Sequence, residues 1–362
     1  MVLVPSFGRD ADQDLFVRAV AGVLALDHQV EIWPLAGPGR AAQRDGALLV
    51  DDLAAPEPSA MPGGTEQAWK TAAERLQVDP PDLLVLAGDL VVPRGELLEP
   101  DGPLGAGNGL RTAGLPLTGL RRPRCLPLWR RVGALLAIGR AEAATLAQAA
   151  GRPVDTIGTY LAINPFAVTE PPWFVPSEPF VALVDCSPTT DDGAASNLGE
   201  EMGGWLAAAL DDDALVAIRG IDALRWPRGR QTSAPAVVSR SDLWRVLAHA
   251  RAVVPVGAEL GTARCALESL LLGTPVLASP GTLAGDLAVE SRGGLAVDAD
   301  WRLVHACRWL LEHPETASAA GACGRRWATR HVGNPEAFVD RVRHALGLRS
   351  NAGPPEPATR AR

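Results

Sequence analysis

Residues 252–279 read AVVPVGAELGTARCALESLLLGTPVLAS, and this stretch decides the fold. It begins with a short apolar run at 252–256, turns at Gly257, and ends with a second apolar run at 275–279. Residues 263–272 lie between the runs and have the composition of a helix that Gly273 stops. Two buried strands joined by a helix form a βαβ unit, which predicts parallel strands.

The same alternation of apolar runs and helical patterns extends along the chain. Several runs are continuously apolar, as is typical of strands that helices cover on both faces. They predict a doubly wound α/β fold with parallel sheets. The expected strands are residues 2–4, 30–35, 83–86, 134–138, 156–162, 181–184, 215–218, 253–256, 275–278 and 295–297.

A proline-rich stretch divides these strands into two sets of similar number. Residues 169–179 contain four prolines, which prevent regular structure. We therefore expect an N-terminal Rossmann-like domain over residues 1–170 and an interdomain linker over 171–179. A C-terminal Rossmann-like domain is expected over 180–348, followed by a disordered tail over 349–362.

Composition excludes several classes of protein. The 362 residues are 47% hydrophobic, and 34 Lys and Arg stand against 42 Asp and Glu, a net charge of -8 that argues against a protein built to coat nucleic acid. The five cysteines form no C-x-x-C pair, so we expect small buried side chains rather than zinc ligands or disulfides. No apolar run approaches the length of about 20 residues that spans a membrane, and we expect a cytoplasmic protein.

The turn at residues 257–262 is the best candidate for a ligand site, because open α/β sheets bind ligands where a strand leads into a helix. Gly261 allows a ligand to approach the backbone, and Thr262 is a capping residue. We expect the amides of Thr262, Ala263 and Arg264 to face an anion such as a phosphate, with Arg264 adding a charge-assisted contact.

Glu268 is a carboxylate inside an otherwise apolar helix. It follows Thr262 by six residues, or about 9 Å along a helix axis. One interpretation is that it accepts hydrogen bonds from the hydroxyls of a ribose. The other is that it faces solvent on an amphipathic helix, and the spacing does not choose between the two.

Residues 241–346 resemble the C-terminal half of a family 4 glycosyltransferase, a GT-B enzyme. The matching stretches are DLWRVLAHARAVVP at 242–255, ALESLLLGTPVLAS at 266–279, GLAV at 294–297 and LLEHP at 310–314, with weaker matches at 27–32 and 152–161. The resemblance implies two facing Rossmann-like domains with parallel sheets and a cleft between them. It also implies that the second domain holds a nucleotide-sugar donor and the first an acceptor.

The resemblance also implies roles for two glutamates. Glu268 matches the family glutamate that contacts the donor ribose. Glu259 falls near a second family glutamate, which faces the transferred sugar and the charge that develops at its anomeric carbon. The two residues are nine positions apart here, whereas the family spacing is eight.

Other positions depart from the family pattern. The family places basic residues for the donor pyrophosphate where residues 184–193 read VDCSPTTDDG, with three acids and no base. Ser187 in this stretch stays a donor-binding candidate, and Arg219, Arg264 or Arg240 is expected to replace the missing cations.

The first half offers further candidates after two of its expected strands. The family has a histidine near the transferred sugar where this chain has LAGD at 86–89, so Asp89 is a candidate for a sugar hydroxyl or a metal, or else a solvated turn residue. Gly8 and Arg9 follow the first strand in place of a glycine-rich loop. Arg9 is a candidate phosphate clamp, or it pairs with Asp10 at the rim.

The resemblance implies a retaining glycosyltransferase of the hexosyltransferase kind, with a UDP- or GDP-linked sugar as co-substrate and no metal or other cofactor. The expected acceptor is a glycan, a lipid-linked molecule or a small molecule. Two alternatives stay open: a catalytically degenerate GT-B scaffold in a glycosylation pathway, and a sugar epimerase. Residues 121–131, with five arginines beside Leu126, Leu128 and Trp129, predict either a peripheral contact with an anionic membrane or a solvated connection.

Overall fold

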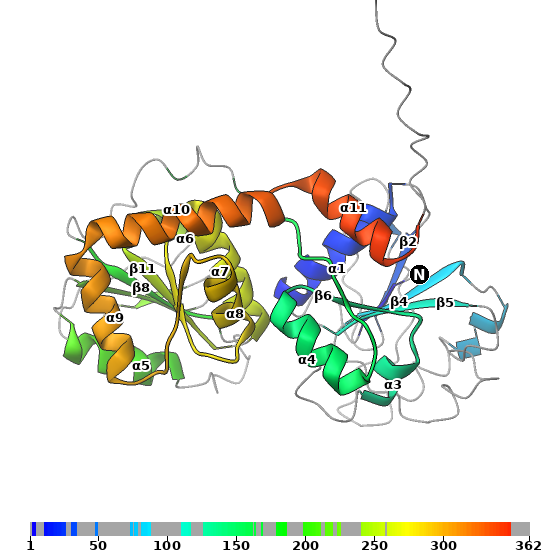
Figure 1. Cartoon of the computed structure of the whole chain (residues 1–362), viewed down its shortest axis with the longest axis horizontal. Coiled ribbons are helices and arrows are strands. Elements are labelled where there is room, and N and C mark those ends of the chain that lie inside the picture. The colour runs from blue at the N-terminus through cyan, green and yellow to red at the C-terminus, as the bar shows by residue number, and fades with distance from the viewer. Residues whose placement is uncertain are drawn as a thin grey trace, which may run out of the picture. The chain divides into compact units, whose positions relative to one another are not determined.

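The computed structural model of the chain is shown in Figure 1. It divides into two compact units, each described by itself: unit 1 comprises residues 1–9, 17–157 and 336–362, and unit 2 comprises residues 10–16 and 158–335. The structure describes residues 2–4, 11–26, 30–34, 48–49, 73–74, 76–78, 81–87, 110–116, 126–161, 163, 168, 179–186, 198–210, 214–219, 223–225, 240–257 and 259–348.

Unit 1 contains a seven-stranded sheet in the order β3-β2-β1-β4-β5-β6-β7, in which every pairing is parallel. The strand order changes direction between β1 and β4, as in a Rossmann fold. The strands are β1 (Val2–Val4), β2 (Val30–Pro34), β3 (Leu48–Leu49), β4 (Leu83–Ala87), β5 (Arg111–Leu115), β6 (Ala134–Ala137) and β7 (Asp155–Thr156). The helices α1 (Ala11–Leu24), α3 (Leu126–Arg131), α4 (Arg140–Ala150) and α11 (Pro335–Ala345) lie wholly or largely in this unit.

Unit 2 contains a six-stranded sheet in the order β10-β9-β8-β11-β12-β13. Only the edge strand β10 is antiparallel among these described strands. The strands are β8 (Val181–Asp185), β9 (Leu215–Arg219), β10 (Ala223–Arg225), β11 (Ala252–Val256), β12 (Val276–Ala278) and β13 (Gly294–Ala296). The helices are α5 (Leu198–Ala209), α6 (Arg240–His249), α7 (Glu259–Leu272), α8 (Leu283–Glu290), α9 (Trp301–Glu312) and α10 (Pro314–His331).

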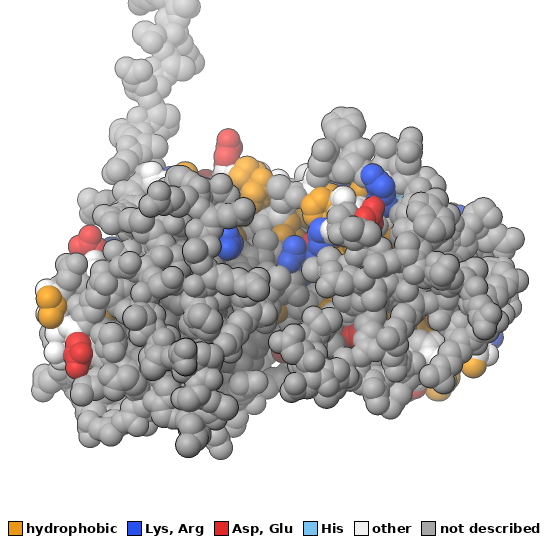
Figure 2. Space-filling view, turned by 180° about the vertical axis from the view of Figure 1, so that it is seen from behind, with side chains coloured by type: hydrophobic (Ala, Val, Ile, Leu, Met, Phe, Trp, Pro, Cys, Tyr) orange, Lys and Arg blue, Asp and Glu red, His pale blue; other side chains and the backbone are white. Residues whose placement is uncertain are grey.

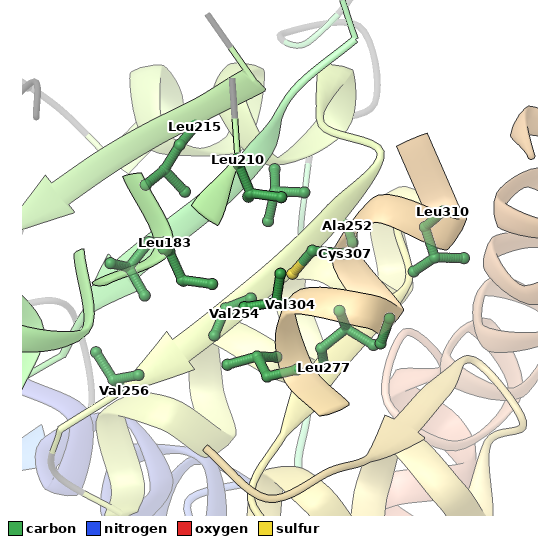
Figure 3. Packing of buried hydrophobic residues seen from close by; sticks show 14 of the residues in the cluster. Leu183, Leu210, Leu215, Ala252, Val254, Val256, Leu277, Val304, Cys307 and Leu310 are labelled. Carbon is green, nitrogen blue, oxygen red and sulfur yellow. The ribbon is translucent and has the colours of Figure 1, made fainter. Parts of the chain in front are cut away.

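Both faces of the unit 2 sheet are buried, which explains why its strands are continuously apolar. On one face, Leu183 of β8 and Val254 of β11 pack with Cys307 and Leu310 of α9 (Figure 3). On the other face, the alternate residues of the same strands pack against α6. The core therefore holds β8 and β11 rigidly side by side.

The sequence pattern located ten of these strands, and it missed β3, β5 and β10. Strand β5 reads RTAGL and lacks the β-branched run that identifies the others. Its Gly114 makes room for a tryptophan, since a Cβ there would come within 2.8 Å of the Trp129 ring. The strand expected at 156–162 is also much shorter, because β7 ends at Thr156.

Helix α11 completes unit 1 although it follows all of unit 2 in the sequence. Phe338 and Val342 are buried there. The Arg341 Nε donates a hydrogen bond of 2.7 Å to the carbonyl oxygen of Ile157, and Arg111 donates to the carbonyl of Leu346. These contacts fix the C-terminal helix to residues of the first half.

The basic stretch at residues 121–131 is described in part, because residues 126–131 form helix α3. Leu128 and Trp129, two of the apolar residues in this stretch, are buried in unit 1. Residues 121–125 lie outside the described part. Basic, acidic and apolar side chains all occur among the described residues on the face in Figure 2. Within the described residues, no helix combines the length and the hydropathy needed to cross a membrane.

Candidate functional site

The carboxyl ends of β8 and β11 meet at the point where the strand order of unit 2 reverses. Val256 is the register partner of Asp185, and the Cys186 amide donates a 2.7 Å hydrogen bond to the Val256 carbonyl. Gly257 follows at a φ of 106°, a conformation that favours glycine, so the chain turns sharply there toward α7. In open α/β sheets this crevice is where ligands bind.

Helix α7 begins at Glu259, four residues before the expected start. The Thr262 hydroxyl donates a 2.8 Å hydrogen bond to the Glu259 carbonyl, which ties the first turn together. Gly261, Thr262 and Ala263 are buried in the opening turns. From Ala263 onward each amide can reach the carbonyl four residues earlier within α7, so the amides left for an anion are those of the first four residues, 259–262.

Glu268 lies within an arginine pair. The Arg240 Nε and Nη2 donate to its two carboxylate oxygens at 2.9 and 2.6 Å, and the Arg264 Nε donates to Oε1 at 3.2 Å. Arg240 is the first residue of α6, and Arg264 lies one turn before Glu268 on α7. We call Arg240, Arg264 and Glu268 the arginine–glutamate cluster.

The three side chains of the cluster differ in their exposure to solvent. The Glu268 side chain is 1% exposed, whereas those of Arg240 and Arg264 are 20% and 14% exposed. The solvent-facing interpretation of Glu268 is therefore wrong. A carboxylate buried among apolar residues costs several kcal/mol in lost hydration, and three hydrogen bonds from cations offset that cost.

The other predicted residues are distributed around this edge or fall outside the described part. Glu259 is half-buried in the first turn of α7. Arg219 ends β9 as the register partner of Asp185, and its side chain is not among those described. Ser187, Asp89, Gly8 and Arg9 lie outside the described residues.

Sequence reasoning had named Arg240 only as a replacement cation, and it had no signal for the pairing with Glu268. The two residues are 28 positions apart, on different helices. Asp185 was noted only as one of three acids, yet the residue is buried, with 4% of its surface exposed, at the carboxyl end of β8. Over the described residues, no group of three or more His, Cys, Asp and Glu side chains is arranged to hold a metal ion.

Comparisons with known proteins show the fold. No family model matches the chain, and no curated protein matches it in sequence. Among solved structures it is similar to sucrose-phosphate synthase from Thermosynechococcus elongatus, with a TM-score of 0.64, 13% identity, and 96% of this chain and 98% of that one covered. Anabaena HepE in complex with UDP-glucose gives a TM-score of 0.62 at 13% identity, covering 96% and 98%.

A third similar structure is WaaG, a glycosyltransferase involved in lipopolysaccharide biosynthesis. Its TM-score is 0.59 at 13% identity, with 94% of this chain and 98% of that chain covered. The chain therefore has the two-unit α/β fold of GT-B glycosyltransferases, which confirms the predicted fold class.

Proposed function

We propose that the protein is a glycosyltransferase with a UDP- or GDP-linked sugar as donor. It transfers the sugar, with retention of the anomeric configuration, to a glycan, a lipid-linked molecule or a small molecule. Unit 2 binds the nucleotide, and no metal takes part. The observation that carries this proposal is the arginine–glutamate cluster on the two helices next to the β8 and β11 crevice.

Three features support a nucleotide donor at this edge. The crevice lies at a topological switch point, where doubly wound sheets bind nucleotides. The two arginines of the cluster are of the residue type that binds phosphate groups through paired hydrogen bonds. The HepE structure of the same fold holds UDP-glucose.

Binding of UDP, GDP and their common sugar conjugates to the full chain tests the donor site. We expect micromolar affinity for one nucleotide by isothermal titration calorimetry. If neither nucleotide binds, the proposal is wrong and a scaffold remains. If a bound nucleotide sugar is converted without an acceptor, the activity is an epimerase.

Glu259 is our candidate for the residue that serves the transferred sugar. Its carboxylate belongs to the first turn of α7, at the carboxyl edge of the sheet, where it would stabilise the charge at the anomeric carbon. We expect Glu259→Gln to lower the transfer rate at least about 100-fold while nucleotide affinity changes less than about twofold.

Glu315 provides a matched control, since it is an exposed glutamate in the first turn of α10. Glu315→Gln removes the same charge from the same kind of position and should leave the transfer rate unchanged. Equal transfer by Glu259→Gln and the native protein would rule out the assigned role.

A further inference from the structure

Helix α9 carries two exposed tryptophans on its outer face. Its inner face is apolar, and Cys307 and Leu310 pack there in the core of unit 2 (Figure 3). On the opposite side, Trp301 and Trp309 are 68% and 46% exposed. Burial of such a ring is favourable, so two of them left in water on one face mark a surface that binds a partner.

The two rings lie on the same side of the helix. Residues 301, 305 and 309 follow one another at four-residue intervals, the spacing that places side chains on one helix face. His305, between the tryptophans, is exposed as well. Eight residues of helix separate the Cα atoms of Trp301 and Trp309 by about 12 Å along the axis. We call Trp301, His305 and Trp309 the aromatic face of α9.

Each tryptophan ring is supported by a neighbour. The His313 ring stacks on Trp309 with centroids 3.7 Å apart and 15° between the planes, and its Nδ1 lies 2.9 Å from the Trp309 carbonyl oxygen. The Arg302 guanidinium lies over the Trp301 ring, 5.8 Å from the centroid, and is itself held by an ion pair with Asp298. A ring whose orientation is already fixed loses little conformational entropy when a ligand stacks on it.

The charges around the rings balance one another. Arg302 lies 2.6 and 3.8 Å from Asp298 and Asp300. Arg308 and Glu312, both exposed, add one charge of each sign. Three carboxylates would repel an anionic membrane, and charged groups this close to the rings are unlike the centre of a protein interface. A neutral ligand rich in hydroxyls fits better, because hydroxyls accept from arginine and donate to carboxylates.

The aromatic face begins at the edge of the sheet that bears the crevice. Strand β13 ends at Ala296, and α9 begins five residues later with Trp301. Since β11, β12 and β13 are parallel, their carboxyl ends share one edge. A chain molecule along the outer face of α9 therefore extends from Trp309 toward the edge where the donor is proposed to bind.

We propose that the aromatic face of α9 binds an uncharged glycan chain, with Trp301 and Trp309 each stacking on a pyranose ring. The C–H groups on one side of a pyranose carry partial positive charge and match the negative face of an aromatic ring. This proposal rests on the proposed function. Among the acceptors considered there, it selects a glycan of several sugar units, part of which is held outside the reaction site.

Electrophoresis of the full chain through native gels that contain a polysaccharide tests the proposal. The probes are four neutral polysaccharides: dextran, glycogen, galactomannan and arabinoxylan. We expect at least one of them to retard the native protein. The dissociation constant obtained from the retardation should rise at least about fivefold in Trp301→Leu and in Trp309→Leu. If none of the four retards the native protein, the proposal is wrong.

The choice of substitution separates stacking from general apolar contact. Leucine keeps an apolar side chain and removes the flat ring, so a protein or lipid partner would tolerate it and a sugar would not. Trp309→Tyr keeps a ring and should bind within about threefold of the native protein. Equal binding by Trp309→Leu and the native protein would overturn the proposal.

Trp205 of α5 provides the matched control. It is 39% exposed, and within the described residues no ring or guanidinium stacks on it. Trp205→Leu removes the same kind of side chain from the surface of the same unit, and it should bind the polysaccharide as the native protein does. Circular dichroism establishes that each variant is folded.

Two further measurements separate the alternatives. If sedimentation velocity shows a native dimer that Trp309→Leu dissociates, the aromatic face joins two copies of the chain and the proposal is wrong. Nucleotide titration distinguishes this proposal from the proposed function. A protein that binds a nucleotide and no polysaccharide overturns the glycan site alone, whereas one that binds a polysaccharide through the aromatic face and no nucleotide overturns the proposed function alone.

Discussion

Cys307 lies in the middle of the unit 2 core, on the inner face of α9 (Figure 3). Burial raises the pKa of its thiol to about 12, because the apolar surroundings disfavour the thiolate. The thiolate is the reactive form of cysteine. In native protein at pH 8, iodoacetamide should therefore modify half-buried Cys323 and leave Cys307 intact. Peptide mass spectrometry measures both sites, and equal modification would contradict the assignment.

The same thiol makes stability fall at alkaline pH. In the unfolded chain it ionises near its ordinary pKa of 9.0, whereas in the folded chain it stays protonated to about 12. Between these values the unfolded state binds fewer protons, so the free energy of unfolding decreases as pH rises. Urea titrations at pH 8 and pH 10.5 should show a larger loss for the native protein than for Cys307→Ala.

Only part of the candidate site could be predicted at the level of single residues. Glu268 stood out because a carboxylate is unusual in an apolar helix. Its partner Arg240 gave no such signal, because a contact between helices depends on how the sheet brings them together. The environment of Asp185 likewise follows from the neighbouring strand ends and not from its own sequence.

Helix α10 packs against the turn that ends α7 through a row of glycines. A Cβ on Gly321 would lie 1.9 Å from the Gly273 carbonyl oxygen, and one on Gly324 would lie 3.0 Å from the Gly293 Cα. Gly273 itself has a φ of 85°, which fits the predicted stop of α7. The close approach of α10 and α7 therefore depends on the absence of side chains.

Gly321→Ala should lower the free energy of unfolding by about 1–3 kcal/mol, because backbone atoms must move to admit the methyl group. Gly204 is the control: it lies within α5, and a Cβ there would meet nothing within 4 Å. Gly204→Ala should raise stability by up to about 1 kcal/mol through helix propensity. Urea denaturation measures both, and a neutral Gly321→Ala would contradict the packing.

The apolar runs of the sequence located ten of the strands, whereas the start of helix α7 was predicted four residues too late. Residues 259–262 contain glycine and threonine and were predicted as a turn, but they form the first residues of α7. Trp301 and Trp309 of α9 are exposed, because Leu303, Cys307 and Leu310 form the inner face of the helix. Helical spacing identifies an amphipathic helix, and packing decides which stripe is inside.

In the whole molecule, the stability of unit 1 depends on α11. Phe338 is 2% exposed in that helix, and Phe338→Ala should destabilise unit 1 by about 3–5 kcal/mol. Hydrogen exchange measured by mass spectrometry should then speed up at residues 134–150 and stay unchanged at residues 252–272. Units with separate cores open separately, which is why the effect is expected in one of them.

Leu310→Ala in α9 is the reciprocal control, because Leu310 belongs to the core of unit 2. It should speed up exchange at residues 252–272 and leave residues 134–150 as they are. Uniform acceleration by either variant would show that the two units unfold together.

The position of α11 has a consequence for how the protein is made. During synthesis, residues 17–157 leave the ribosome well before residues 336–345. Most of unit 1 is therefore made before the helix α11 that completes it. Unit 2 is the first to have all of its residues available, although most of it is encoded later. The apolar face that α11 covers is therefore exposed in the newly made N-terminal half, and chaperones that recognise such faces should bind it until residues 336–345 have been synthesised.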